Sequence, residues 1–378
     1  MLRRHTSLIQ GLAILCLLGG HGVESIRAQA PKLFDVEVPA GHLVGLPVHW
    51  GTYDAVLLEP SGQMQFIEQS DVQSHRTLPY DFAPQSVADA RAELQNELGA
   101  NYETIVFGPY VIAAPLGQAE HWRTRFSRLL AGYLRYFEVR HWPLRRPDFP
   151  LRVVVYATRA EFMAYSSRQV KQIPSSMVGC YSPRTNRCAL YNIDLPSSTN
   201  ANASTSAARD AATNWSETEA TIVHEAVHQL AYNSGIHERL SMEPLWFIEG
   251  LACMFEQPSV YDSGQKGSLA SRMDPARQQR LKAVIDQPSL LVSYLQSLSE
   301  SDELFERNIE VAYDLSWALT FYVAERMPAE FRQYSRALAS RPFGEYPSIE
   351  RSRDFRNAFG GDLSLLAGRL MHMLKETH

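Results

Sequence analysis

The stretch SETEATIVHEAVHQLAYN, residues 216–233, decides the fold of this chain. Ser216 followed three residues later by Glu219 forms a capping box, which predicts that a helix begins there. Asn, Ser and Gly at 233–235 are typical of a helix end. The stretch therefore predicts a single helix with defined start and stop signals.

Two histidines of this helix predict a metal site. His224 and His228 are four residues apart, so both imidazoles project from one face and can bind one tetrahedral metal ion. Glu225 lies beside them, where its carboxylate can take a proton from a metal-bound water, as in the His-Glu-x-x-His pattern. A catalytic zinc also needs a third protein ligand, which must come from elsewhere in the chain.

The next predicted helix, PLWFIEGLACMFE over residues 244–256, supplies a carboxylate at Glu249. Pro at 244 suits a helix start, and Pro at 258 ends the helix. A carboxylate inside an otherwise apolar helix is costly unless it meets a cation, so Glu249 is the predicted third ligand. Gly250 predicts a close approach to the metal helix, and Glu256 is expected at the helix end near the surface.

His237 is the alternative third ligand, nine residues after His228. The metzincin pattern, His-Glu-x-x-His-x-x-Gly-x-x-His, would place Gly at position 231 and the third His at position 234. Here those positions are Ala231 and Ser234, so the metzincin pattern fails and the sequence favours Glu249.

Residues 218–257 resemble the gluzincin (peptidase MA-like) zinc metallopeptidases, and more narrowly an uncharacterised bacterial family of unknown function related to them. The resemblance rests on the two motifs above and on the twenty residues that separate His228 from Glu249. It implies that His224, His228 and Glu249 bind Zn²⁺ and that Glu225 is the catalytic base and acid. It also implies an α+β fold, with a thermolysin-like zincin core of antiparallel or mixed sheet plus the active-site helix, followed by a mostly helical C-terminal subdomain.

The enzyme implied by the resemblance is a metallopeptidase that cleaves a peptide or protein substrate. Glu225 would assist the attack of zinc-bound water and later protonate the leaving amine. Two alternatives stay open: a catalytically silent, zinc-stabilised binding module, and a hydrolase of a non-peptide amide such as a cell-wall component. The intact Glu225 argues against the silent module, because a structural zinc site has no use for an unliganded carboxylate.

Two more features are expected at the site from the same resemblance. Tyr313 is the candidate catalytic residue for stabilising the tetrahedral intermediate, as a similar tyrosine does in gluzincin aminopeptidases. The alternative is a core tyrosine bonded to a backbone carbonyl. Arg187–Asn192 is expected to be the edge strand that holds the substrate antiparallel, or else an ordinary edge strand.

The chain divides into four predicted parts: a signal peptide at 1–30, a β-rich region at 31–100, a zincin-like catalytic domain at 101–257 and a helical subdomain at 258–378. The signal peptide is indicated by basic residues at 3 and 4, an apolar run over 8–20 and the small-residue site Ala28-Gln29-Ala30. The protein is therefore expected to be exported, as a periplasmic, cell-surface or secreted protein. A retained anchor is the alternative.

Composition and cysteines restrict the partners further. The 378 residues contain 36 Lys plus Arg and 41 Asp plus Glu, a net charge of -5, so no nucleic-acid partner is expected. After the first 20 residues no apolar run approaches the ~20 residues that a membrane span needs. In an oxidising compartment Cys180 and Cys188, which flank a turn, are predicted to form a disulfide, and Cys253 to be a small buried helix residue.

The hydrophobic pattern of the rest of the chain predicts the other strands, helices and loops. The run from Leu195 to Trp215, rich in Ser, Thr, Asn and Ala, is expected to be a mobile loop. Apolar runs and periodicity predict strands at 34–39, 55–58, 64–67, 104–113 and 150–157, and helices at 88–98, 119–137, from 159, 274–286, 289–298, 306–326, 328–340 and 361–374.

Overall fold

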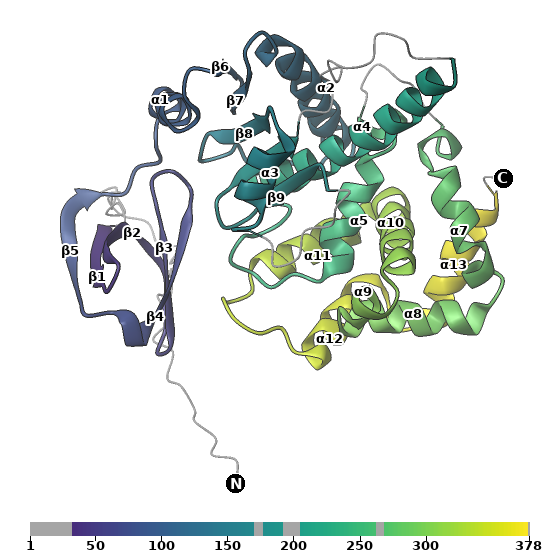
Figure 1. Cartoon of the computed structure of the whole chain (residues 1–378). Helices are drawn as coiled ribbons and strands as arrows, with labels where there is room; N and C mark the ends of the chain where they lie inside the picture. The colour runs from purple at the N-terminus through teal and green to yellow at the C-terminus, as the bar shows by residue number, and fades with distance from the viewer. Residues whose placement is uncertain (1–31, 170–176, 192–204, 262–267, 377–378) are drawn as a thin grey trace, which may run out of the picture.

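The computed structural model describes residues 32–169, 177–191, 205–261 and 268–376 of the chain. The predicted signal peptide lies outside the described residues. Within them the chain forms two five-stranded sheets and 13 α-helices, with the helices concentrated in the C-terminal part (Figure 1). The prediction of an α+β protein with a helical C-terminal part is confirmed at this level.

The first sheet is an antiparallel meander with one strand returning to its other edge. Its strands are β1 (Lys32–Val38), β2 (Gly41–Trp50), β3 (Asp54–Leu58), β4 (Met64–Glu68) and β5 (Ser74–Asp81), in the order β4-β3-β2-β1-β5. The predicted strands at 34–39, 55–58 and 64–67 are confirmed. Val36, Ala55 and Leu57 lie at the centre of its small core, and Figure 1 shows this sheet beside the rest of the molecule.

The second sheet carries the framework of the site. Its strands are β6 (Tyr102–Phe107), β7 (Tyr110–Pro115), β8 (Leu151–Tyr156), β10 (Arg187–Tyr191) and β9 (Gly179–Ser182), in that spatial order. The single strand predicted at 104–113 is therefore a hairpin, which turns at Gly108 with a φ of 49°. The prediction that Arg187–Asn192 is an edge strand is wrong, because β10 pairs on both sides and β9 forms the edge.

Helices cover both faces of this sheet because successive strand residues point to opposite faces. Val153 and Val155 of β8 face α2 (Ala119–Glu138) and α4 (Thr205–Ser234) in the main core. Val154 faces α1 (Val87–Leu98) and α3 (Arg159–Ser166) in a smaller core on the other side. The long helix α4 therefore crosses one face of the sheet, and its C-terminal half is fixed by that core.

The start of α4 differs from the sequence prediction. The helix begins at Thr205, so the predicted capping box at Ser216 is inside it and the expected loop is helical over 205–215. Residues 192–204 of that expected loop lie outside the described residues. The predicted end is confirmed, because α4 stops at Ser234 and Gly235 has a φ of 82°.

The predicted disulfide between Cys180 and Cys188 is wrong. In the antiparallel pairing of β9 with β10, Cys180 lies opposite Ala189 and Cys188 lies opposite Tyr181. The two cysteines are thus one position out of register and point to opposite faces of the sheet, into different cores. Both are buried free thiols.

The C-terminal part is an assembly of helices around the helix Ile309–Arg326. They are α5 (Leu245–Phe255), α6 (Pro258–Tyr261), α7 (Pro275–Ile285), α8 (Pro288–Glu300), α9 (Glu303–Arg307), α10 (Ile309–Arg326), α11 (Pro328–Ala339), α12 (Ser348–Phe359) and α13 (Leu363–Glu376). The helix α12 was not among the predicted elements. None of the helices in the described ranges has the length and apolar character that crossing a membrane requires.

Gly250 allows a close contact between two of these helices. A Cβ at this position would lie 2.2 Å from Thr320 Oγ1 and 2.4 Å from the carbonyl oxygen of Ser316, both on α10. The close approach predicted from Gly250 therefore occurs, but the partner is α10 and not the metal helix α4.

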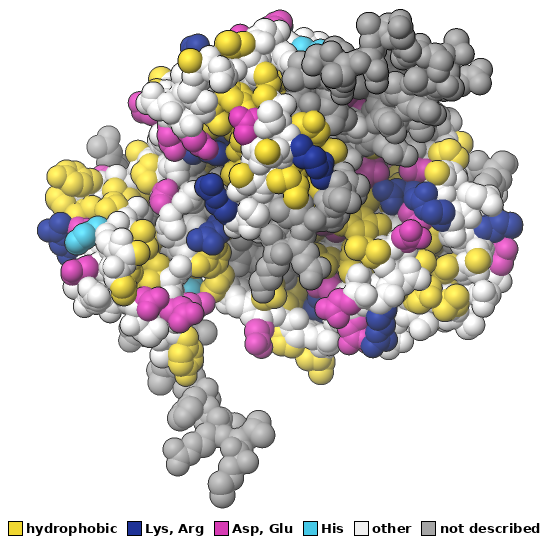
Figure 2. All heavy atoms as spheres, in the orientation of Figure 1, with side chains coloured by type: hydrophobic (Ala, Val, Ile, Leu, Met, Phe, Trp, Pro, Cys, Tyr) yellow, Lys and Arg dark blue, Asp and Glu magenta, His cyan; other side chains and the backbone are white. Residues whose placement is uncertain are grey.

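On the surface, the described basic side chains of the face in Figure 2 lie among acidic ones and do not form one patch.

Candidate metal centre

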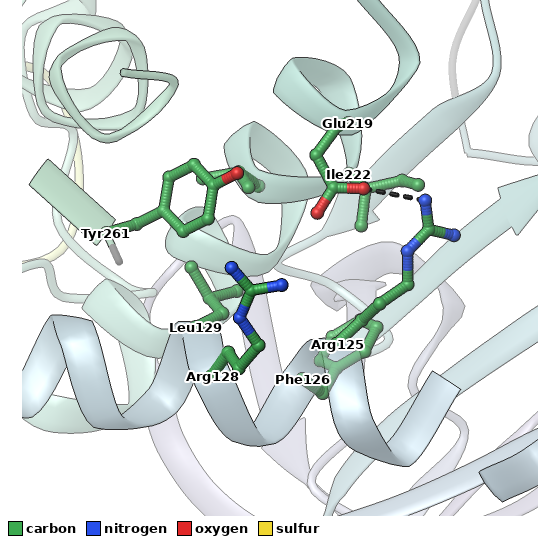
Figure 3. A pocket seen from close by; sticks show the side chains of 8 residues that line it. Arg125, Phe126, Arg128, Leu129, Glu219, Ile222 and Tyr261 are labelled. Carbon is green, nitrogen blue, oxygen red and sulfur yellow. Dashed lines mark hydrogen bonds and ion pairs between the residues drawn. The ribbon is translucent and has the colours of Figure 1, made fainter. Parts of the chain in front are cut away.

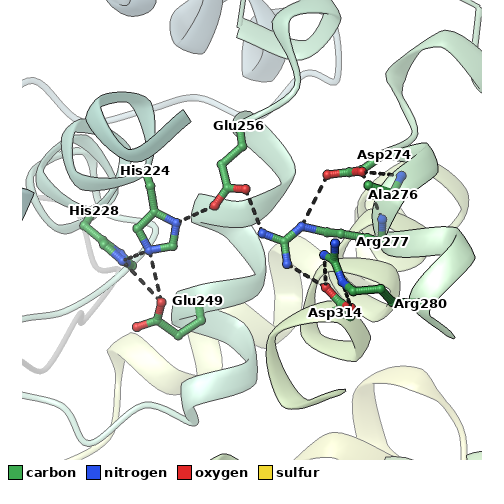
Figure 4. Close-up of polar contacts among 9 residues, drawn as sticks. All are labelled: His224, His228, Glu249, Glu256, Asp274, Ala276, Arg277, Arg280 and Asp314. Atoms are coloured by element: carbon green, nitrogen blue, oxygen red, sulfur yellow. Dashed lines mark hydrogen bonds and ion pairs between the residues drawn. The ribbon is translucent and has the colours of Figure 1, made fainter. Parts of the chain in front are cut away.

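His224 and His228 on α4 and Glu249 on α5 converge on one point (Figure 4). His224 Nε2 lies 3.0 Å from His228 Nε2 and 3.1 Å from Glu249 Oε2, and His228 Nε2 lies 3.6 Å from the same oxygen. Bonds of about 2.0–2.1 Å to a tetrahedral zinc place its ligand atoms about 3.3 Å apart. The three atoms therefore have the mutual spacing of ligands to one metal ion.

The protonation of His224 supports the same interpretation. Glu256 Oε1 lies 2.8 Å from His224 Nδ1, so a proton on Nδ1 is donated to this carboxylate. His224 Nε2 then presents a lone pair toward Glu249 Oε2 and His228 Nε2, and His228 Nε2 does the same when the proton of that ring is on Nδ1. Three lone pairs that face one another need a cation between them, so these residues fit a bound divalent metal.

The acidic groups make the centre attractive to cations. Burial alone would raise the pKa of Glu249, but the charge of His228 and hydrogen bonds from both histidines hold it well below its usual range. Burial would lower the pKa of His224, whereas hydrogen bonds with Cys253, Glu249 and Glu256 raise it well above its usual value. A metal ion would therefore replace a proton held between these groups.

Glu256 has a different place from the one expected. Its side chain is only 17% exposed, and it joins the metal centre to the C-terminal helices. Glu256 Oε2 accepts a hydrogen bond from Arg277 Nη2 at 2.7 Å, and Arg277 Nη1 donates to Asp314 Oδ1 at 2.9 Å. Arg280 forms two further bonds with Asp314, so the chain of contacts in Figure 4 runs from the histidine to α7 and α10.

Glu225 is close to the ligands but points to the sheet. The backbone N–H of Tyr181 on β9 donates to Glu225 Oε2 at 2.7 Å. A Cβ at Gly179 would lie 2.9 Å from Glu225 Cγ, so the glycine lets the edge strand approach this carboxylate. Glu225 is therefore held between the metal helix and the edge of the sheet, outside the group of converging ligand atoms.

The structure also brings Tyr313 to the centre. Its ring centroid lies 6.4 Å from that of His224. Burial raises the pKa of Tyr313 well above its usual value, and the negative charge of Glu249 adds to this effect. Tyr313 is thus a neutral phenol beside the ligand group. Tyr322, on the same helix, is buried in the main core.

His237 lies in other surroundings. It is buried, its Nδ1 is 2.6 Å from Glu243 Oε2, and its ring lies 4.7 Å from that of Phe247. Among the described residues two groups could hold a metal ion, His224 with His228 and Glu249, and His224 with Cys253 and Glu256, and neither contains His237. The contact of Glu256 with His224 was not predicted, although the position of Glu256 seven residues after Glu249 places both carboxylates on one helix face.

A separate pocket lies on the side of α4 that faces α2 (Figure 3). There Arg125 Nη2 donates to Glu219 Oε2 at 2.6 Å, and the Arg125 guanidinium lies 4.7 Å from the centre of the Trp122 ring. Glu219, predicted to cap the helix, instead joins α4 to α2. This ion pair fixes α4 five residues before His224.

Comparison with known proteins adds a family but no activity. Residues 218–344 match a family whose description is "Protein of unknown function (DUF1570)". No curated protein matches the chain. The matched region contains the three converging ligands, Glu225 and Tyr313, together with Glu256, Arg277 and Asp314. The resemblance to a family of unknown function is thus confirmed for this region, which holds every residue of the candidate centre.

Proposed function

We propose that this protein is an exported, zinc-dependent hydrolase, a metallopeptidase of the gluzincin type with a thermolysin-like core. The observation that carries the proposal is the convergence of His224, His228 and Glu249 with Glu225 next to them. A structural metal site needs only ligands. Here one carboxylate of the His-Glu-x-x-His motif stays outside the ligand group, where a proton acceptor is needed.

In this mechanism some residues of the centre would bind the metal ion and others would transfer protons or donate hydrogen bonds. His224, His228 and Glu249 would hold Zn²⁺, which when bound acts as a Lewis acid and lowers the pKa of its water to about 7. Glu225 would accept a proton from the attacking water and pass it to the leaving nitrogen. Tyr313 would donate a hydrogen bond to the oxyanion of the tetrahedral intermediate.

The edge strand β9 supports a peptide as the substrate. Cys180 pairs with Ala189 of β10, whereas the N–H of the next residue, Tyr181, points away from β10 to Glu225. The outer side of β9 is therefore directed to the centre, and an extended peptide can add there as a further antiparallel strand. We propose that β9, and not β10, takes the role of the substrate-binding strand.

Two other functions compete with this proposal. A silent zinc module would bind the metal without turnover, and a hydrolase of a non-peptide amide would use the same residues on another substrate. The position of Glu225 favours an enzyme over the silent module. The edge strand favours a peptide over other amides.

The test compares wild type with Glu225→Gln on a peptide library, together with the zinc content of both proteins. We expect equal zinc content, an unchanged fold and a loss of hydrolysis by several orders of magnitude, because only the proton carrier is removed. Equal turnover by the two proteins would contradict the mechanism. Zinc binding with no cleavage of any peptide by wild type would favour the silent module or the non-peptide hydrolase.

A further inference from the structure

A pocket of about 210 Å³ lies where the N-terminal sheet meets the C-terminal end of α4. Val48, Leu58 and Met64 of the N-terminal sheet form one wall, and Tyr232 and Arg239 lie opposite. Tyr232 is one helical turn beyond His228, on the same face of α4. The N-terminal sheet therefore shares a pocket with the helix that carries the metal ligands.

Two hydrogen-bond donors in this pocket have no acceptor. Arg239 Nε donates to the carbonyl of Pro183 at 2.7 Å, and Nη2 donates to the carbonyl of Gly62 at 2.6 Å. Within the described ranges neither Arg239 Nη1 nor the Tyr232 hydroxyl makes a hydrogen bond, and neither is among the buried unpaired atoms. Both donors are therefore accessible to a ligand.

The charge of Arg239 is also without a carboxylate partner. No acidic side chain of the described residues forms an ion pair with it. Glu238, which also lines the pocket and whose charge acts on Arg239, pairs with Arg145 at 3.6 Å. Asp148 also lines the pocket but is exposed to solvent. A guanidinium beside apolar walls, with a phenol next to it, suits a ligand that carries a carboxylate on an aliphatic stem.

We propose that this pocket binds the side chain of an acidic residue of the substrate, two or three residues before the scissile bond. The proposal rests on the proposed peptidase function. Tyr181 N contacts Glu225, and Pro183, which accepts from Arg239, is two residues further along the chain, about 7 Å in a strand. A peptide antiparallel to β9 would place its residues before the scissile bond at that end. The ring of Tyr181 stacks on that of Tyr232, with centroids 5.7 Å apart, and connects the two sites.

The test uses pairs of peptides that differ only in Glu or Gln at the second or third position before the cleaved bond. We expect wild type to prefer the Glu peptide about tenfold in kcat/KM, through a lower KM. Arg239→Gln should remove this preference. Because Arg239 also bonds the carbonyls of Gly62, Pro183 and Arg184, two variants that leave it in place are needed. Tyr232→Phe should weaken the preference, and Val48→Asp, which adds a competing carboxylate to the wall, should abolish it.

Arg76→Gln is the control, because Arg76 is a 73% exposed arginine on β5 of the same sheet that pairs with Asp35 and does not line the pocket. It should keep the full preference. Equal cleavage of Glu and Gln peptides by wild type, or a preference unchanged in Arg239→Gln, would overturn the proposal and leave the peptidase function intact. Binding of the same peptides to zinc-loaded Glu225→Gln, measured by calorimetry, tests the proposed pocket independently of the proposed peptidase activity. Tighter binding of the Glu peptide that depends on Arg239 would support the pocket even if wild type cleaved neither peptide.

Discussion

Glu256 Oε1 lies 2.8 Å from Nδ1 of His224, on the side of the imidazole that faces away from the other two ligands. A carboxylate in this place fixes the tautomer and the orientation of a metal-binding histidine. Glu256 lies at the C-terminal end of α5, where Arg277, itself bonded to Asp314, holds the Glu256 carboxylate in place.

Arg277→Met should weaken zinc binding about 10- to 100-fold, because Glu256 would lose the partner that directs it to His224. Competition with a chelator of known affinity measures this effect without any substrate. Arg280→Met is the control, since Arg280 bonds Asp314 and is half exposed. Equal zinc affinity of Arg277→Met and wild type would show that His224 is oriented without this contact.

His224→Ala, His228→Ala and Glu249→Ala should each abolish stoichiometric zinc, because each removes one of three converging ligand atoms. Elemental analysis of the purified variants measures one zinc per chain in wild type and none in these proteins. His237→Ala should retain the metal. Full retention in Glu249→Ala, with loss in His237→Ala, would instead make His237 the third ligand.

The convergence of His224, His228 and Glu249 could be predicted from sequence because its information is local. The spacing of His224 and His228 fixes their common face, and an isolated carboxylate in an apolar helix needs a cation. The contacts of Glu256 and Glu219 depend on Arg277 and Arg125, which are distant in sequence. No local pattern shows which residue will meet a carboxylate at that range.

The two wrong predictions for the second sheet, the disulfide and the edge strand, have a related cause. A shift of one residue in strand register moves a side chain to the other face, so the spacing of Cys180 and Cys188 did not decide whether they meet. Strand order is also a tertiary property. The chain passes through β9 before β10, yet β9 lies outside it, and this order makes Tyr181 the neighbour of Glu225.

Tyr313→Phe should lower kcat about 10²- to 10³-fold while zinc content and melting temperature stay nearly unchanged. The phenol lies beside the ligand group, and its removal deletes one donor without a change in packing. Tyr322→Phe, from the same helix, should turn over like wild type. If both variants do so, the Tyr313 hydroxyl has no part in the reaction.

The three described cysteines should be unreactive in the native protein and all reactive in denaturant without a reductant. All three are buried, and burial raises the pKa of Cys180 and of Cys253 to about 11. Thiolates are the reactive form, so alkylation should wait for unfolding. Mass spectrometry of the alkylated chain counts the labels. A single labelled cysteine among the three would restore the disulfide between Cys180 and Cys188.

Gly250→Ala should destabilise the protein by about 1–3 kcal/mol or more, because the new methyl group meets backbone and side-chain atoms of α10 that cannot all move away. Gly368→Ala is the matched control: this glycine lies within α13, and nothing approaches its Cβ position within 4 Å. Here the substitution should stabilise by about 0.5–1 kcal/mol, through helix propensity alone. Denaturant unfolding measures both values.

Because Glu249 is the neighbour of Gly250, displacement of α5 should also weaken zinc binding in Gly250→Ala. Zinc binding should be unchanged in Gly368→Ala. Equal stability of the two variants would mean that α5 and α10 can separate without cost, and that their contact does not hold the third ligand in place.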